Sequence, residues 1–156
     1  MQETSINMDK TPDKATLFRE KAANYLCCFC DQCPRHANCL RWEVGQYIDP
    51  KLHVATCISP RYSKAQDGSC EYFRDNQPLT MPVGMKHFYH DMPGHTERAI
   101  KNTLIGHSCR ATYYKYHRGD RPIHPAMLAD IQSVCRMFGW TAPLHFDAEV
   151  TDYWWE

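Results

Sequence analysis

The sequence lacks the two features that mark exported and membrane proteins. Its first 14 residues are polar and charged and contain no apolar core of the kind a secretory signal needs. No stretch approaches the roughly 18 consecutive apolar residues of a membrane-spanning helix. We therefore expect a cytoplasmic protein without membrane contact, in which thiols stay reduced.

The sequence also lacks net charge and recognisable enzyme motifs. Its 18 Lys and Arg residues balance 18 Asp and Glu residues, so only the local distribution of charge can indicate a partner. No Gly-rich phosphate loop, nucleophile–base pair, pair of carboxylates or open three-ligand metal site can be recognised. We expect the protein not to be an enzyme. Its 4 Trp, 9 Tyr and 6 Phe residues predict a folded chain.

Cysteine, by contrast, is abundant and clustered. The chain has nine cysteines, and the stretch 27–39 alone holds Cys27, Cys28, Cys30, Cys33 and Cys39. An odd number leaves a thiol unpaired in any disulfide scheme, and a reducing compartment disfavours disulfides. This density predicts metal ligation, and we expect a metal ion to hold the region together.

The spacing of the cysteines favours some of them as ligands but does not select a single set of four. Two thiolates at Cys30-x2-Cys33 can reach one ion from a tight turn. Cys39 and Cys70 complete a set of four, and Cys28 competes with Cys30 for the first place.

Three further choices concern the site. His36 could replace one thiolate, whereas Cys57 lies in a predicted strand at 52–58 and is expected to be an ordinary buried thiol. Zn²⁺ is favoured as the cofactor because no electron-transfer site can be recognised nearby. An iron–sulfur cluster and a dithiol redox centre remain alternatives.

The second half of the chain predicts helices. A linker at about 75–84 contains Pro78, Pro82 and Gly84, and helices are expected near 85–89, 95–106, 109–117 and 125–138. The predicted fold class is α+β and mostly α. The expected order is a loose tail (1–13), a Cys-rich metal-stapled module with short strands (14–77), a helix-turn-helix-like helical domain (85–140) and an acidic aromatic tail (141–156).

Positive charge is concentrated in this second half. Residues 95–125 hold six Lys and Arg residues against two acidic residues, a local charge of +4 (6 − 2). Two short helices joined by a tight turn, the second basic and aromatic, are typical of helix-turn-helix proteins. We therefore predict DNA as the partner, contacted through Ser108, Arg110, Tyr113, Lys115, Arg118 and Arg121. The alternative is a helical bundle with a solvated basic face.

The run Tyr116-x2-Gly119-x-Arg121-Pro122-x2-Pro125 resembles the phage-repressor (Cro/CI-like) helix-turn-helix family. In that family an aromatic residue late in the recognition helix is followed by Gly, a basic residue and then Pro at the next helix. The resemblance implies a DNA-binding transcriptional regulator.

Three groups of residues resemble an uncharacterised Bacteroidetes family of unknown function. They are Cys33-Pro34 with Cys39-Leu40-Arg41, Gly68-x-Cys70-x-Tyr72-Phe73-Arg74, and Tyr113-Tyr114 with Arg118 and Arg121-Pro122-Ile123-x-Pro125. The resemblance implies Cys28, Cys33, Cys39 and Cys70 as the ligand set, because the family has no cysteine at the position of Cys30. It implies no activity.

The C-terminal tail indicates a second kind of partner besides DNA. Residues 144–156 contain four acidic residues, no Lys or Arg, and several aromatic residues. Aromatic ends of this kind usually dock onto their own domain, although an acidic tail could also cover the basic helix. Alternatively, the aromatic tail could bind a protein partner, and the chain would then be a zinc-stapled interaction module without nucleic-acid binding.

Overall fold

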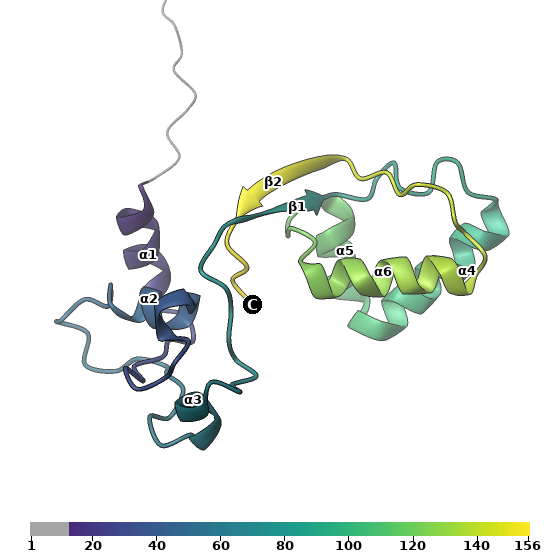
Figure 1. Ribbon diagram of the computed structural model, residues 1–156. Coiled ribbons are helices and arrows are strands. Elements are labelled where there is room, and N and C mark those ends of the chain that lie inside the picture. The colour runs from purple at the N-terminus through teal and green to yellow at the C-terminus, as the bar shows by residue number, and fades with distance from the viewer. Residues whose placement is uncertain (1–12) are drawn as a thin grey trace, which may run out of the picture. The chain divides into compact units, whose positions relative to one another are not determined.

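The computed structural model describes residues 13–156, which form two compact units (Figure 1). The first unit extends to Gln77 and includes Trp155 and Glu156, and the second is Pro78–Trp154. The fold is α+β and mostly helical, as predicted. Residues 1–12, which make up nearly all of the predicted loose tail, lie outside the described residues.

The first unit contains short helices joined by long loops. Its elements are α1 (Lys14–Ala22), the 3-10 helix η1 (His36–Asn38), α2 (Leu40–Gly45) and α3 (Ser63–Asp67). Helix α1 begins at Asp13, whose carboxylate accepts a hydrogen bond from the Thr16 backbone N–H at 2.9 Å. Such a cap satisfies a donor that the first turn cannot pair internally.

Aromatic side chains form the main packing between α1 and the end of the chain. Phe18 is fully buried and meets Tyr47 and Trp155 edge to face, with centroid distances of 5.4 and 5.8 Å. Tyr25 meets the same indole at 5.4 Å. The predicted docking of the aromatic end thus applies to Trp155, which packs inside the first unit.

The predicted strand at 52–58 is wrong. In this segment only Cys57 pairs, through an isolated parallel bridge to Cys27. Val54 is 82% exposed, so the alternating pattern does not face a core. Cys57 is exposed as well, contrary to the expected buried thiol, because no second strand covers this loop.

The second unit contains three helices and one small sheet. The helices are α4 (Gly94–Ser108), α5 (Arg110–Arg118) and α6 (Pro125–Met137). They lie where the sequence predicted them, although α4 continues past Gly106. The predicted helix at 85–89 is wrong, because these residues form turns. Gly119 and Gly139 follow α5 and α6 with φ of 83° and 75°, a conformation that glycine adopts without strain.

The helices of this unit enclose a continuous core. Its fully buried members include Ile100 and Leu104 on α4, Tyr113 on α5 and Ile131 on α6. The four-residue spacing of Ile100 and Leu104, and of Met127 and Ile131, places each pair on one helical face.

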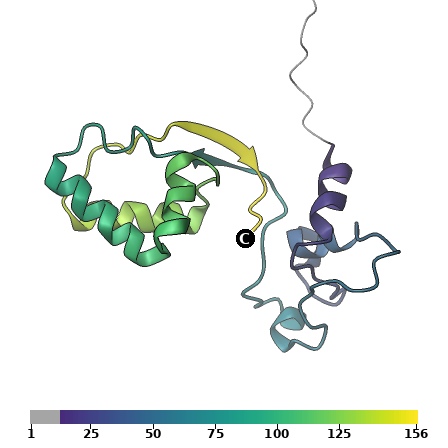
Figure 2. The same cartoon turned by 180° about the vertical axis from the view of Figure 1, so that it is seen from behind.

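A correction concerns the predicted linker and tail, which pair with each other. Strand β1 (Leu79–Val83) and strand β2 (Ala148–Asp152) form an antiparallel ribbon with Met81 opposite Val150. Both views show the two strands side by side (Figures 1 and 2). Pro82 is tolerated because a strand in a two-stranded sheet has a free edge. Trp154, just after β2, stacks on His124 at 5.6 Å.

Candidate metal centre and basic helix face

A small cavity in the first unit is lined by the four cysteines that the resemblance implied. Its volume is about 20 Å³, close to that of one water-sized particle. The lining consists of Cys28, Cys33, Arg35, Cys39, Ile58, Gly68, Cys70, Tyr72 and Phe73. Cysteines from three separate segments of the chain therefore line one space.

Backbone pairing orients Cys28 toward this cavity. The N–H of Cys27 donates to the Thr56 carbonyl at 3.1 Å, and the N–H of Ile58 donates to the Cys27 carbonyl at 2.9 Å. In such an extended segment successive side chains point in opposite directions. The thiol of Cys27 accordingly turns away toward the Ala22 carbonyl, 3.8 Å away, whereas Cys28 lines the cavity.

A chain of tight turns presents Cys33 and Cys39. The N–H of Cys33 donates to the Cys30 carbonyl at 3.3 Å, and the N–H of His36 donates to the Cys33 carbonyl at 3.1 Å. After η1, the N–H of Cys39 donates to the His36 carbonyl at 3.0 Å, and α2 begins. Cys39 is thus held at the N-terminal end of α2.

Arg41 on α2 holds the distant segment that carries Cys70. This arginine is only 5% exposed. Its Nε donates to the Tyr72 carbonyl at 2.7 Å, and its Nη1 donates to the Leu26 carbonyl at 3.1 Å. The N–H of Leu40 also donates to the Arg74 carbonyl, at 2.7 Å. These bonds tie residues before and after the cysteine cluster to one helix.

Glycine is required in the turn before Cys70. Gly68 has φ of 80°, and a Cβ at this position would lie 2.8 Å from Cγ of Pro34. Arg35 closes the same side, because its guanidinium carbon lies 3.4 Å from the centre of the Phe73 ring and its Nη1 donates to the Gly68 carbonyl at 3.3 Å. The turn and the cysteine loop therefore pack directly on each other.

Two competing ligand candidates do not line the cavity. Cys30 is buried, and its contact with Cys28 is a hydrogen bond from the Cys30 backbone N–H to the Cys28 sulfur atom. His36 packs against the Trp42 ring at 4.8 Å, and its Nδ1 lies 2.7 Å from the Cys33 carbonyl oxygen.

The thiols lie around the cavity without forming a closed coordination shell. Within residues 13–156, no three His, Cys, Asp or Glu side chains are spaced to hold an ion as they stand. Burial raises the pKa of Cys28, and the neighbouring Cys39, Cys30 and Cys70 raise it further, whereas the hydrogen bond from the Cys30 N–H lowers it. Without a cation, the environment thus favours a neutral thiol.

The second candidate site is the exposed face of α5. Arg110, Ala111, Lys115 and Arg118 are exposed, and Tyr114 is half-buried. Their spacing of one, four, five and eight residues from Arg110 places them on one side of a helix. Three of the predicted contact residues therefore share a basic, solvent-facing stripe.

Tyr113 does not belong to this face, which corrects the predicted contact set. Its side chain is fully buried, and its hydroxyl lies 2.8 Å from the hydroxyl of Tyr89. Burial raises the pKa of Tyr113 to about 12. A residue enclosed by its own core cannot reach a nucleic acid, and the packing of α4 and α6 determines this orientation.

Three of the predicted contact residues, one of them on the exposed stripe, make internal contacts. The Ser108 hydroxyl donates to the Leu104 carbonyl at 3.0 Å, and Cys109 rather than Ser108 precedes α5. Arg118 forms a salt bridge with Asp120 at 2.7 Å. Arg121 lies over the Tyr116 ring, with 5.3 Å between the guanidinium carbon and the ring centroid.

Sequence reasoning missed the contribution of α4 to this surface. A groove of about 430 Å³ between α4 and α5 is lined by Gly94, Glu97, Arg98, Lys101, Asn102, Ile105, Arg110 and Tyr114. The ammonium of Lys101 lies 5.8 Å from the centre of the Tyr114 ring. Spacing of three and four residues along α4 (98, 101, 102 and 105) could have indicated this shared face.

The surroundings of His117 lower its pKa. Burial lowers its pKa, and the nearby cations Lys101, Lys86 and Arg118 lower it further, against the opposing effect of Asp147. The imidazole is therefore held neutral where several bases converge.

No helix in the described part of the chain is long and apolar enough to cross a membrane.

Comparisons with known proteins place the chain in a family. No curated protein and no solved structure matches the chain. A model of a family of unknown function, DUF6078, matches residues 8–155, nearly the whole sequence. The chain therefore belongs to the DUF6078 family.

Proposed function

We propose that the first unit holds one structural Zn²⁺ ion through the thiolates of Cys28, Cys33, Cys39 and Cys70. The observation that carries this proposal is that these four side chains, from three separate segments, line one cavity of about 20 Å³. Four thiolates are a typical closed ligand set for structural zinc. A space of this size suits a single ion better than a multi-atom iron–sulfur cluster.

The ion would take over the role that a larger apolar core has in other domains. The segments that carry the cysteines are otherwise joined mainly by loop hydrogen bonds, such as those of Arg41. A divalent cation reverses the preference for neutral thiols, because coordination deprotonates the sulfur atoms and pairs their charge. Binding free energy then becomes folding free energy for this unit.

For the second unit, we propose that the basic face of α4 and α5 binds DNA. Arg110, Lys115 and Arg118 form one exposed stripe, and Arg98 and Lys101 extend it across the groove. Bases and a half-buried tyrosine at a groove suit contact with phosphates, and short side chains such as Ala111 allow the helix to approach base edges. The protein would act as a cytoplasmic transcriptional regulator.

Salt dependence tests the DNA proposal. Arg110→Ala and Lys115→Ala should each weaken binding to a mixed-sequence duplex and lower the slope of log affinity against log salt by about 1, because each removes one phosphate contact. Fluorescence anisotropy at several salt concentrations measures both quantities. Arg61→Ala is the matched control, since Arg61 is an exposed base in the first unit. Absence of binding at low salt would end this proposal and leave the zinc proposal intact.

A further inference from the structure

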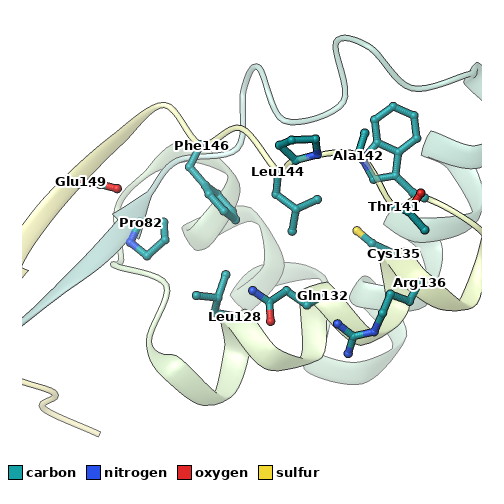
Figure 3. Close-up of a pocket in the computed structure, with 12 residues that line it drawn as sticks. Pro82, Leu128, Gln132, Cys135, Arg136, Thr141, Ala142, Leu144, Phe146 and Glu149 are labelled. Atoms are coloured by element: carbon teal, nitrogen blue, oxygen red, sulfur yellow. The ribbon is translucent and has the colours of Figure 1, made fainter.

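A second cavity in the second unit is large enough for an organic ligand. It has a volume of about 590 Å³, within the roughly 300–1,000 Å³ of small-molecule sites. It lies between α6 and the segment that leads to β2 (Figure 3). None of its lining residues belongs to the zinc cavity or to the α4–α5 groove.

The walls of this cavity are mainly apolar. Leu128, Leu144 and Phe146 project into it, and Cys135 contributes its sulfur atom (Figure 3). Burial raises the pKa of Cys135 to about 11, so this thiol is neutral at physiological pH and acts as part of the apolar wall. Such a surface favours the hydrocarbon body of a ligand.

Three polar groups at the cavity have no partner among the described residues. In the described part of the chain, the Trp140 indole N–H is buried and donates to no hydrogen-bond acceptor. The side chains of Gln132 and Arg136 likewise make no hydrogen bond or salt bridge with any described residue. Of these groups only the Trp140 N–H is an unpaired buried donor, which is rare in folded proteins, whereas Gln132 and Arg136 are exposed and can bind water or a ligand. Two of these three groups, the indole and the guanidinium, can only donate hydrogen bonds.

Charge is distributed unevenly along the cavity. Arg136 and Thr141 lie at one end, and Glu149 and Pro82 lie at the other (Figure 3). An anionic group is therefore attracted to the Arg136 end and repelled from the Glu149 end. The Arg136 guanidinium and this distribution of charge favour a ligand with a negatively charged acceptor next to an apolar body.

We propose that this cavity binds a small organic carboxylate, with its carboxylate at Arg136 and its hydrocarbon portion against Leu128, Leu144 and Phe146. Trp140 also lines this cavity, so its indole N–H resonance reports whether a ligand is bound. Recognition of such a ligand rests neither on the zinc ion nor on DNA binding, so the site is tested without either.

The test compares carboxylates with neutral analogues of the same shape. Octanoate and 3-phenylpropanoate are titrated into the full-length protein, and octanamide and 3-phenylpropanamide are the controls. The readouts are calorimetric affinity and the NMR resonance of the Trp140 indole N–H, assigned with a Trp140→Phe variant. At least one carboxylate should bind and shift this resonance, and its amide should bind about tenfold more weakly, since it loses a charge-assisted hydrogen bond.

Variants localise the carboxylate. Arg136→Gln should reduce the affinity of the carboxylate about tenfold and leave that of the amide unchanged, because only the charged contact is lost. Arg136 is exposed, so this substitution leaves the core intact. Glu149→Gln should not weaken binding, and Arg61→Gln should have no effect. Equal affinities of acid and amide, an unchanged affinity in Arg136→Gln, or no binding by either probe would overturn the proposal.

Discussion

At the scale of single residues, the buried tyrosine pair is the feature with the clearest energetic consequence. The hydroxyls of Tyr89 and Tyr113 lie 2.8 Å apart inside the core of the second unit. Removing one hydroxyl leaves the other buried without a partner, which costs about 1–3 kcal/mol, whereas removing both can be nearly neutral. We therefore expect Tyr89→Phe or Tyr113→Phe alone to destabilise the protein more than the double variant does. Chemical denaturation of all four proteins measures this coupling, and strictly additive losses would contradict the pairing.

The same pair predicts a loss of stability at alkaline pH. Burial raises the pKa of Tyr113 from 10.0 to about 12, and the pKa of Tyr89 is raised by burial and by its bond to Tyr113. At a pH between 10.0 and about 12, Tyr113 is deprotonated in the unfolded chain and protonated in the folded chain. The free energy of unfolding therefore falls as the pH rises through this range. Denaturation at about pH 8 and about pH 11 should show this fall. The double Phe variant should show a smaller one, and an equal fall would exclude the tyrosines as its cause.

Two cysteines of the second unit should differ strongly in reactivity. Cys109 is exposed, and hydrogen bonds from the Thr112 hydroxyl and backbone N–H lower its pKa. Cys135 is buried, and burial raises its pKa to about 11. Because the thiolate is the nucleophile, iodoacetamide at neutral pH should label Cys109 quickly and Cys135 hardly at all. Peptide mapping by mass spectrometry measures both rates, and equal labelling would contradict the packing of α6.

At the scale of secondary-structure elements, the glycines show which helix ends the sequence could predict. The sequence predicted helix ends near residues 117 and 138, and α5 and α6 end at Arg118 and Met137, shortly before Gly119 and Gly139. The β1–β2 pairing could not be predicted, because Leu79 and its partner Asp152 lie at opposite ends of the second unit and neither strand has a strong pattern. The orientation of Tyr113 required the packing of α4 and α6, which a single helix does not reveal.

A matched pair of glycine substitutions tests this element structure. Gly119 has φ of 83°, and a Cβ there would lie 3.2 Å from Cγ1 of Val83. We expect Gly119→Ala to destabilise the protein by about 1–2 kcal/mol, the cost of the left-handed conformation. Gly106 lies within α4 with no atom near a new Cβ, so Gly106→Ala should stabilise by about 0.5–1 kcal/mol. Thermal denaturation measures both, and effects of the same sign would contradict the assigned conformations.

At the scale of the whole molecule, the two units should depend on a metal ion to different degrees. The density of cysteines predicts a metal ion from sequence alone, but their spacing leaves Cys28 and Cys30 as alternative ligands. Only the folded loops show that Cys28, and not Cys30, lines the cavity. The second unit has a continuous apolar core around Ile100, Leu104 and Ile131, whereas the cluster at the cysteines of the first unit has only Cys28, Cys30 and Ile58 as buried members. A strong chelator should therefore disrupt the first unit and leave the second folded. Amide resonances assigned to each unit would show this difference, and simultaneous loss of both sets would contradict independent cores.

Elemental analysis of the purified protein tests the metal centre most directly. We expect about one zinc per chain, as four thiolate ligands imply. The zinc should be retained in Cys30→Ser, and it should be lost or greatly reduced when any proposed ligand is replaced, in Cys28→Ser, Cys33→Ser, Cys39→Ser or Cys70→Ser. A protein that contains no metal yet keeps a folded first unit, or one that contains iron and absorbs visible light, would contradict a structural zinc ion at these four cysteines.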